Sequence, residues 1–298
     1  MNTIQDAPSL LKDFIRLTRP RHWVKNLLVL APLFFGLKLT DRALLMQSVI
    51  AFVVFCLAAS SVYIFNDLND VTSDRSHPLK RKRPIAAGHV SKGKAVCVMV
   101  LLAAASLGLS FFLPRLATGW ICLYLFLNIV YSTGLKHVAI LDVFIIALGF
   151  LLRLEVGSAA TAIPLSMWIM LITFVMALFI GLAKRRDDLI LRENGVSGTR
   201  KSIDGYNLEF VNHGMTAMAA VLTVSYIMYT VSPEIARHFH SNYLYLTVVF
   251  VILGLLRYMQ RAFVDGDTGS PVEILFHDRF IQLTVLGWIV AFWALLYR

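Results

Sequence analysis

The chain has 298 residues, of which 58% are hydrophobic and only 15% are charged. Its mean hydropathy of +0.70 exceeds what the core of a soluble protein of this length requires, so the surplus of apolar residues must face lipid. The formal net charge of +10 is explained by basic loops at a membrane surface, without nucleic acid as a partner.

Apolar stretches long enough to cross about 30 Å of hydrocarbon recur along the chain. They predict a single all-α polytopic membrane domain over residues 1–298, with about nine transmembrane helices near 24–39, 43–65, 94–113, 119–133, 138–158, 165–183, 213–232, 243–261 and 280–297. Residues 1–18 are polar and of mixed charge, unlike a secretory signal, so the first span is expected to remain as an anchor.

The basic residues are distributed unevenly between the two ends of the predicted spans. Most of the 28 Lys and Arg residues lie in the N-terminal segment or in loops at about 66–93, 134–138, 184–212 and 262–279. Because basic loops stay on the cytoplasmic side of a membrane, the N-terminus and these loops are predicted to be cytoplasmic. The same loops hold most polar motifs, so the functional site is expected on that face.

An acidic motif follows the second predicted span. Asp67, Asp70 and Asp74 have the spacing i, i+3, i+7, which places them on one face of a helix. Their mutual repulsion would be offset by a hard cation such as Mg²⁺ that also bridges to substrate phosphates, and Asn66 offers a neutral oxygen ligand. The alternative interpretation is a solvated acidic helix end.

A cationic run from His77 to Gly88 comes next. Opposite charges in one membrane-surface loop suit a metal-bound phosphate ligand, although a simple positive-inside cluster would use the same residues. Arg83 is the cation expected to bind phosphate, because prolines at 78 and 84 restrict the backbone around it.

These two segments together resemble the first signature of the UbiA superfamily of intramembrane prenyltransferases, N-D-x-x-D-x-x-x-D followed by K-x-R-P-[IL]-x-x-G. The matching residues are Asn66, Asp67, Asp70, Asp74, Lys82, Arg83, Pro84, Ile85 and Gly88, and a further similar segment contains Tyr131, Ser132, Leu135, Lys136 and Asp142. The resemblance implies a helical bundle around a central cavity in a bacterial plasma membrane. It also implies substrate-binding roles for Asn66, Lys82, Arg83, Tyr131, Lys136 and Asp142.

A second acidic motif, D-x-x-x-D, is typical of that superfamily after the sixth span, and here the chain departs from it. The corresponding stretch has Lys184 at the first acidic position, followed by Arg185, and keeps only Asp188. Cations in place of a metal-binding carboxylate attract a phosphate directly. With Arg200, Lys201 and Tyr206, and with the segment from Arg19 that contains Lys25 and Asn26, this pattern resembles a phosphoribosyltransferase branch of the superfamily.

The resemblance to this branch implies phosphoribosyl pyrophosphate as the donor and a long polyprenyl phosphate of the decaprenyl type as the acceptor. Mg²⁺ on Asp67, Asp70 and Asp74 would hold the pyrophosphate leaving group, with Asp188 a further catalytic candidate. No general base is required, since the attacking phosphate is already an anion near neutral pH. The phosphate-binding cations are expected to include Lys184, Arg185, Arg200 and Lys201.

Two ionisable residues lie within the fifth predicted span. Asp142 and Arg153 are about three helical turns apart and therefore point the same way. Charged groups inside a span normally face a cavity, which makes both candidates for substrate binding. The alternative places Asp142 at the interface and lets Arg153 reach outward to it.

Two other functions stay open at this point. An aromatic prenyltransferase using a prenyl diphosphate would share the fold, but the altered second motif argues against it. A transporter of an anionic lipid or metabolite would explain polar groups in the spans, although transporters usually place them near the bilayer midplane.

Overall fold

The structure, a computed structural model, describes residues 10–77, 80–195, 201–265, 274 and 277–296. Every regular element in this part of the chain is helical, as predicted. The chain divides into two compact units, Met1–Leu165 with Gly195–Lys201 and Ser166–Asn194 with Ser202–Arg298.

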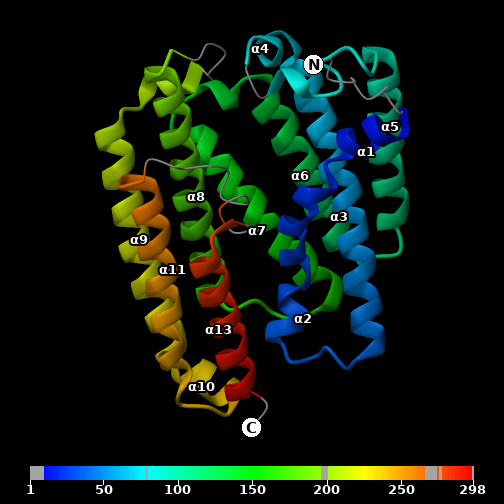
Figure 1. Ribbon diagram of the computed structural model, residues 1–298. Helices are drawn as coiled ribbons and strands as arrows, with labels where there is room; N and C mark the ends of the chain where they lie inside the picture. Colours follow the sequence, from blue (N-terminus) through cyan, green and yellow to red (C-terminus); the bar gives the residue numbers. More distant parts are fainter. Residues whose placement is uncertain (1–9, 78–79, 196–200, 266–273, 275–276, 297–298) are drawn as a thin grey trace, which may run out of the picture. The chain divides into compact units, whose positions relative to one another are not determined.

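The first unit begins with short helices and continues with four long ones (Figure 1). The short helices are α1 (Leu10–Thr18), the 3₁₀ helix η1 (Pro20–Leu30) and α2 (Ala31–Phe35). The long helices are α3 (Arg42–Asn69), α5 (Lys92–Ser110), α6 (Arg115–Thr133) and α7 (Leu141–Thr161). Short elements between them are α4 (Val71–Ser76), η2 (Lys80–Lys82) and η3 (Leu135–His137).

Helix α3 is the packing centre of the first unit and contacts α5, α6, α7 and η1. Small side chains on its buried face, such as Ala51, Ala58 and Ala59, let neighbouring helices approach closely, and Phe55 fills the space against Tyr124 of α6. The α3 helix begins where the Asp41 carboxylate accepts hydrogen bonds from the backbone N–H groups of residues 43 and 44. This packing fixes the end of α3 that carries the acidic motif.

The second unit is built from four longer helices and short connecting elements. The longer helices are α8 (Met167–Glu193), α9 (Leu208–Val231), α11 (Val248–Phe263) and α13 (Arg279–Leu296). The connecting elements are η4 (Lys201–Gly205), α10 (Pro233–Phe239) and η5 (Leu244–Thr247). In Figure 1, α8 lies beside α9 and α11 beside α13.

Seven helices in the described part of the chain are long and apolar enough to cross a membrane, and a shorter apolar helix covers residues 279–295. These helices coincide with the predicted spans from the second to the last. The chain is therefore a multi-span membrane protein. The predicted count of about nine spans is approximate, because residues 24–39, the first predicted span, do not form one long α-helix in the structure.

Residues 24–39 do not form one long helix, as the hydropathy had predicted, but the end of η1 followed by α2. Pro20 and Pro32 each lack a backbone N–H, which weakens a continuous α-helix here. The segment also lies directly on α7: a Cβ added to Gly157 would be 2.0 Å from the Val29 carbonyl oxygen. The segment still runs the length of α3, from the Arg19–Asp67 contact near the C-terminal end of that helix to its start at Arg42, but as a 3₁₀ helix and a short α-helix packed on α7.

Candidate active site

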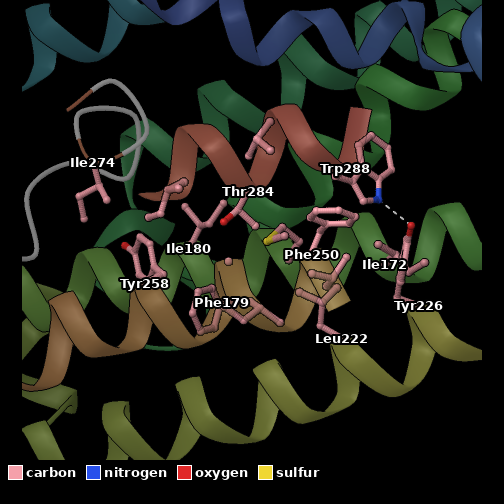
Figure 2. Close-up of a pocket in the computed structure, with 16 residues that line it drawn as sticks. Ile172, Phe179, Ile180, Leu222, Tyr226, Phe250, Tyr258, Ile274, Thr284 and Trp288 are labelled. Atoms are coloured by element: carbon pink, nitrogen blue, oxygen red, sulfur yellow. Dashed lines mark hydrogen bonds between the residues drawn. The ribbon is translucent and has the colours of Figure 1, made fainter. Parts of the chain in front are cut away.

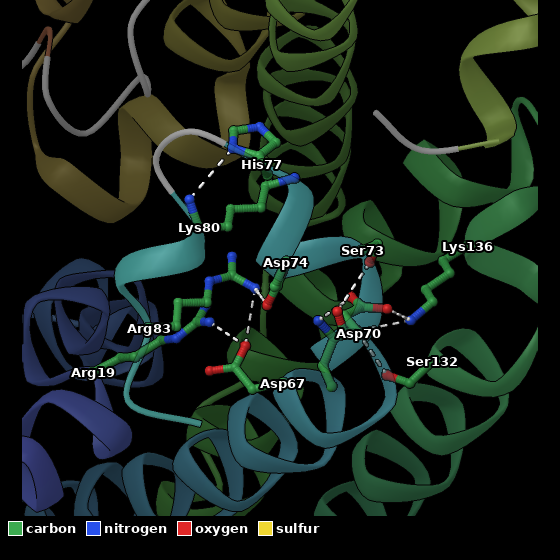
Figure 3. Close-up of polar contacts among 11 residues, drawn as sticks. Arg19, Asp67, Asp70, Ser73, Asp74, His77, Lys80, Arg83, Ser132 and Lys136 are labelled. Carbon is green, nitrogen blue, oxygen red and sulfur yellow. Dashed lines mark hydrogen bonds and ion pairs between the residues drawn. The ribbon is translucent and has the colours of Figure 1, made fainter. Parts of the chain in front are cut away.

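The acidic motif lies where α3 ends and α4 begins, within the first unit. The sequence placed all three carboxylates on one continuous helix, but α3 ends at Asn69 and Asp70 forms the junction with α4. Polar Asn and Asp side chains compete with the backbone for hydrogen bonds, so they favour such a break. The break divides the motif into two adjacent groups, which Figure 3 shows side by side.

Asp67 and Asp74 form the first group, and Arg83 links them. The Arg83 Nη1 atom donates to Asp67 Oδ1 at 3.0 Å and to Asp74 Oδ2 at 2.6 Å. Arg19 donates a second hydrogen bond to Asp67 Oδ1, and its guanidinium lies over the Tyr63 ring at 5.3 Å. Both carboxylates are buried, with Asp67 2% and Asp74 3% exposed, which rules out the alternative of a solvated acidic helix end.

Asp70 forms the second group with Asn66, Ser132 and Lys136. Lys136 donates to Asp70 Oδ1, and Asn66 Nδ2 donates to Asp70 Oδ2 at 3.0 Å. The Asn66 carbonyl oxygen accepts from Ser132 Oγ at 3.3 Å. Lys136 reaches this group from η3, 66 residues along the chain, and is itself buried. The structure thus brings together six of the residues that the sequence singled out, Asn66, Asp67, Asp70, Asp74, Arg83 and Lys136 (Figure 3).

The electrostatic balance of the cluster is set by these ion pairs. Burial raises the pKa of the Asp74 carboxyl above its ordinary value, outweighing the opposite effect of Arg83, and the charges of Asp67 and Asp70 raise it further. Arg19, Arg83 and Lys136 therefore stabilise the carboxylates of the cluster through ion pairs, in a buried environment that otherwise disfavours charge. Such a cluster of buried carboxylates and cations is typical of functional sites.

A second group of predicted residues lies deeper in the first unit. Arg153 Nε donates to Asn26 Oδ1 at 2.9 Å, and its Nη1 donates to the Gly149 carbonyl oxygen at 2.6 Å. The guanidinium also lies over the rings of Phe55 and Tyr124. Arg153 is only 5% exposed, so its side chain packs inside the first unit and does not reach outward. Lys25, beside Asn26 on η1, lies within the electrostatic field of Arg153.

The altered second motif lies on α8 in the second unit. Arg185 is fully buried, and its Nη1 donates to Asp188 Oδ2 at 2.6 Å, one helical turn away. Lys184 is exposed. Arg186 is 7% exposed and donates from Nε to Asn212 Oδ1 of α9 at 2.9 Å. The remaining carboxylate of the motif is therefore neutralised by an arginine of the same helix.

The other predicted residues are more scattered. Tyr131 and Asp142 are buried in the first unit, on α6 and in the first turn of α7. Tyr206 is buried in the second unit against Phe210, with ring centroids 6.0 Å apart. Lys82 and Lys201 are exposed, and Arg200 lies outside the described residues.

The sequence matches the UbiA prenyltransferase family over residues 29–284. The chain belongs to this family. Two relatives named decaprenyl-phosphate phosphoribosyltransferase are 37% identical (Mycolicibacterium smegmatis) and 36% identical (Corynebacterium glutamicum). The first alignment covers 97% of this chain and 94% of the relative, and the second covers 96% and 87%. As a UbiA family member with curated enzyme relatives over almost its whole length, the chain is a transferase of the membrane.

The fold of this UbiA family member is also found among solved structures. A UbiA homolog from Archaeoglobus fulgidus bound to DMAPP and Mg²⁺ superimposes with a TM-score of 0.71, covering 96% of this chain and 99% of that one. An apo UbiA homolog from Aeropyrum pernix K1 gives 0.68. Sequence identities are 19% and 13%, so these structures show a shared fold.

Sequence reasoning did not include Arg19 among the site residues of this UbiA protein. Arg19 has a left-handed backbone with φ 51°, uncommon for a residue with a side chain, and this turn separates α1 from η1. The turn accompanies the contact of Arg19 with Asp67, 48 residues away. The Arg19-Pro20 pair was the only local signal, because proline limits the conformation of the residue before it.

Proposed function

We propose that this enzyme transfers 5-phosphoribose from phosphoribosyl pyrophosphate to a polyprenyl phosphate of the decaprenyl type and releases pyrophosphate. In this reaction the bond between ribose carbon 1 and the pyrophosphate oxygen breaks, and the pyrophosphate leaves with the electron pair. An oxygen of the lipid phosphate forms the new bond to carbon 1. Direct attack from the opposite face inverts the configuration and gives a β-linked product.

The observation that carries this proposal is the charge of the second motif. A prenyl diphosphate held by a second metal requires free carboxylates there, but the carboxylate of Asp188 is paired with Arg185 at 2.6 Å, and Lys184 takes the place of an acid. Fixed positive charge suits a substrate that brings a phosphate without its own metal. The names of the two bacterial relatives point to the same pair of substrates.

The acidic cluster of the first unit is the proposed site for Mg²⁺. Asp67, Asp70 and Asp74 supply the oxygen ligands that this ion prefers. In the described residues, no three acidic, histidine or cysteine side chains already surround a common point. Mg²⁺ is usually bound by one or two carboxylates together with substrate phosphates. When bound, the metal would neutralise charge that develops on the departing pyrophosphate.

The cations of the site have proposed roles as phosphate ligands. Arg83 and Lys136, released from their carboxylates, would contact the pyrophosphate. The remaining predicted cations would contact the 5-phosphate and take part in binding the acceptor phosphate: Lys25, Lys82, Arg153, Lys184, Arg185, Arg200 and Lys201, with Asn26, Tyr131, Asp142 and Tyr206 as uncharged or acidic neighbours. We propose a bacterial plasma membrane as the location. The N-terminus and the basic loops at about 66–93, 134–138, 184–212 and 262–279 would lie in the cytoplasm, because basic loops favour that side.

The test supplies purified enzyme with Mg²⁺, ribose-labelled phosphoribosyl pyrophosphate and undecaprenyl phosphate, and follows label into the organic phase. Asp67→Asn is the control for label carried over without catalysis. Label in the organic phase that depends on the enzyme, the lipid phosphate and Mg²⁺ supports the proposal. Transfer of a labelled prenyl group from a prenyl diphosphate to 4-hydroxybenzoate, without ribose transfer, would establish the aromatic prenyltransferase alternative instead.

A further inference from the structure

The second unit contains an apolar cavity of about 460 Å³ between α8, α9, α11 and α13 (Figure 2). Phe179 and Ile180 of α8, Leu222 of α9 and Phe250 of α11 are among the side chains that line it. This volume lies within the range of sites that bind small molecules. The lining is almost wholly hydrocarbon, so the cavity suits a hydrophobic ligand.

Two tyrosines stand at opposite ends of this cavity, and their hydroxyl groups differ (Figure 2). The Tyr226 hydroxyl is fully engaged, with Thr247 Oγ1 at 2.7 Å and Trp288 Nε1 at 2.6 Å. The Tyr258 hydroxyl is buried and has no hydrogen-bond partner among the described residues. Because buried polar groups are rarely left unpaired, the Tyr258 end is the place where a ligand would supply a polar atom.

A buried cation lies near the Tyr258 end. The Arg186 guanidinium of α8 lies over the Phe263 ring at 5.4 Å, and Phe263 is five residues beyond Tyr258 on α11. The Arg186 Nε atom is bonded to Asn212, but its Nη1 atom has no hydrogen-bond partner in the part of the chain that the structure describes. Asp187, the adjacent residue, is an acid whose charge acts on both Arg186 and Tyr258. The polar end therefore offers one buried donor in the cavity lining, the Tyr258 phenol, and a buried guanidinium N–H of Arg186 next to it on α8.

We propose that this cavity binds the acceptor lipid, with the first isoprene units between the four helices and the phosphate at Arg186 and Tyr258. The inference rests on the proposed function and extends it to a specific site. Phe250 and Tyr258, the first and last residues of α11 that line the cavity, are about 12 Å apart along the helix at 1.5 Å per residue, so only the beginning of a polyprenyl chain fits. The rest of the chain would continue into the bilayer.

The chemistry of the lining favours a polyprenyl phosphate over a membrane phospholipid. A phospholipid carries two acyl chains and ester groups close to its phosphate. The cavity lining offers few polar partners for such esters, since Tyr226 and Trp288 bond to each other and Thr284 donates to the Phe280 carbonyl oxygen. A polyprenyl phosphate joins one hydrocarbon chain directly to its phosphate, which matches an apolar cavity with donors at one end.

The experiment measures crosslinking of a short polyprenyl phosphate that carries a diazirine in its first isoprene units. Gly254→Leu places a side chain in the cavity, and its Cβ would make only an ordinary contact with Thr284, at 3.7 Å. Gly108→Leu makes the same change on an exposed face of α5, where an added Cβ meets nothing within 4 Å. We expect at least tenfold lower labelling for Gly254→Leu and wild-type labelling for Gly108→Leu.

The proposed phosphate-binding end of the cavity is tested by two substitutions. Tyr258→Phe keeps the ring but removes the hydroxyl, and Arg186→Gln removes the charge. We expect both variants to bind polyprenyl phosphate about tenfold more weakly but to bind the corresponding polyprenol, which has no phosphate, as the wild type does. Equal weakening for the alcohol would overturn the assignment of the phosphate end, and equal competition by phosphatidic acid would show a general lipid site.

Failure of this inference is distinguishable from failure of the proposed function. Ribose transfer with label found outside α8, α9, α11 and α13 would overturn the acceptor site and leave the reaction intact. Labelling of these helices without ribose transfer would keep the lipid site and overturn the proposed donor.

Discussion

Arg83 offers the sharpest test of the acidic cluster, because it links two buried carboxylates. Arg83→Ala leaves Asp67 with Arg19 but takes from Asp74 the cation that contacts it at 2.6 Å. Breaking a buried ion pair by removal of one partner costs about 3 to 5 kcal/mol. Since the Arg83 side chain is 25% exposed, water screens part of this interaction, and we expect a loss of about 2 to 3 kcal/mol in unfolding free energy.

A second substitution should recover much of this loss. Asp74→Asn removes the uncompensated charge, so the double variant is expected to be at least about 1 kcal/mol more stable than Arg83→Ala alone. The measurement is a double-mutant cycle from denaturation of the detergent-solubilised protein, with Arg81→Ala as the control, an exposed arginine two residues away. The double variant should regain stability and remain inactive, because Asp74 is a proposed metal ligand.

The pH dependence gives an independent check on the same cluster. The folded-state pKa of Asp74 is raised, so the native protein binds this proton more tightly than the unfolded chain does. Loss of Arg83 raises that pKa further. The stability deficit of Arg83→Ala should therefore shrink as the pH falls from about 8 to about 5. Strictly additive effects of the two substitutions, or a deficit that grows at lower pH, would refute the assigned ion pair.

Three further predictions follow from the site and from the second unit. Asp67→Asn should reduce turnover to less than about a tenth of wild type, equivalent to more than about 1.4 kcal/mol, while the protein stays monodisperse in detergent. Lys184→Ala should weaken phosphate binding, and Lys184→Asp should weaken it more through repulsion, so equal Michaelis constants for the aspartate variant and wild type would contradict the phosphate role. Asp278 accepts hydrogen bonds from Arg257 and from the Ile281 backbone N–H, and despite burial these partners lower its pKa. Asp278→Asn should therefore cost about 1 kcal/mol at neutral pH, and the difference should disappear as the pH falls through the lowered folded-state pKa.

Much of the architecture was predictable from local patterns in the chain. Apolar runs long enough for a bilayer predicted the helices from α3 to α13, because a lipid-facing helix must be apolar along its whole length. The spacing of Asp67, Asp70 and Asp74 predicted that they would lie together. Hydropathy did not predict the form of residues 24–39, since apolar content alone does not distinguish one long α-helix from a 3₁₀ helix followed by a short α-helix.

What only the tertiary structure decided is which residues meet across long stretches of chain. Arg19 contacts Asp67, and Lys136 contacts Asp70, across 48 and 66 residues. Arg186 of α8 packs over the Phe263 ring of α11, the helix whose Tyr258 lies at one end of the apolar cavity. Helical periodicity tells which residues share a face, but the neighbour of that face depends on how all the helices pack together. The sequence alone therefore determined the membrane-spanning character and the acidic motif, whereas helix packing selected the cations that neutralise the motif and formed the cavity.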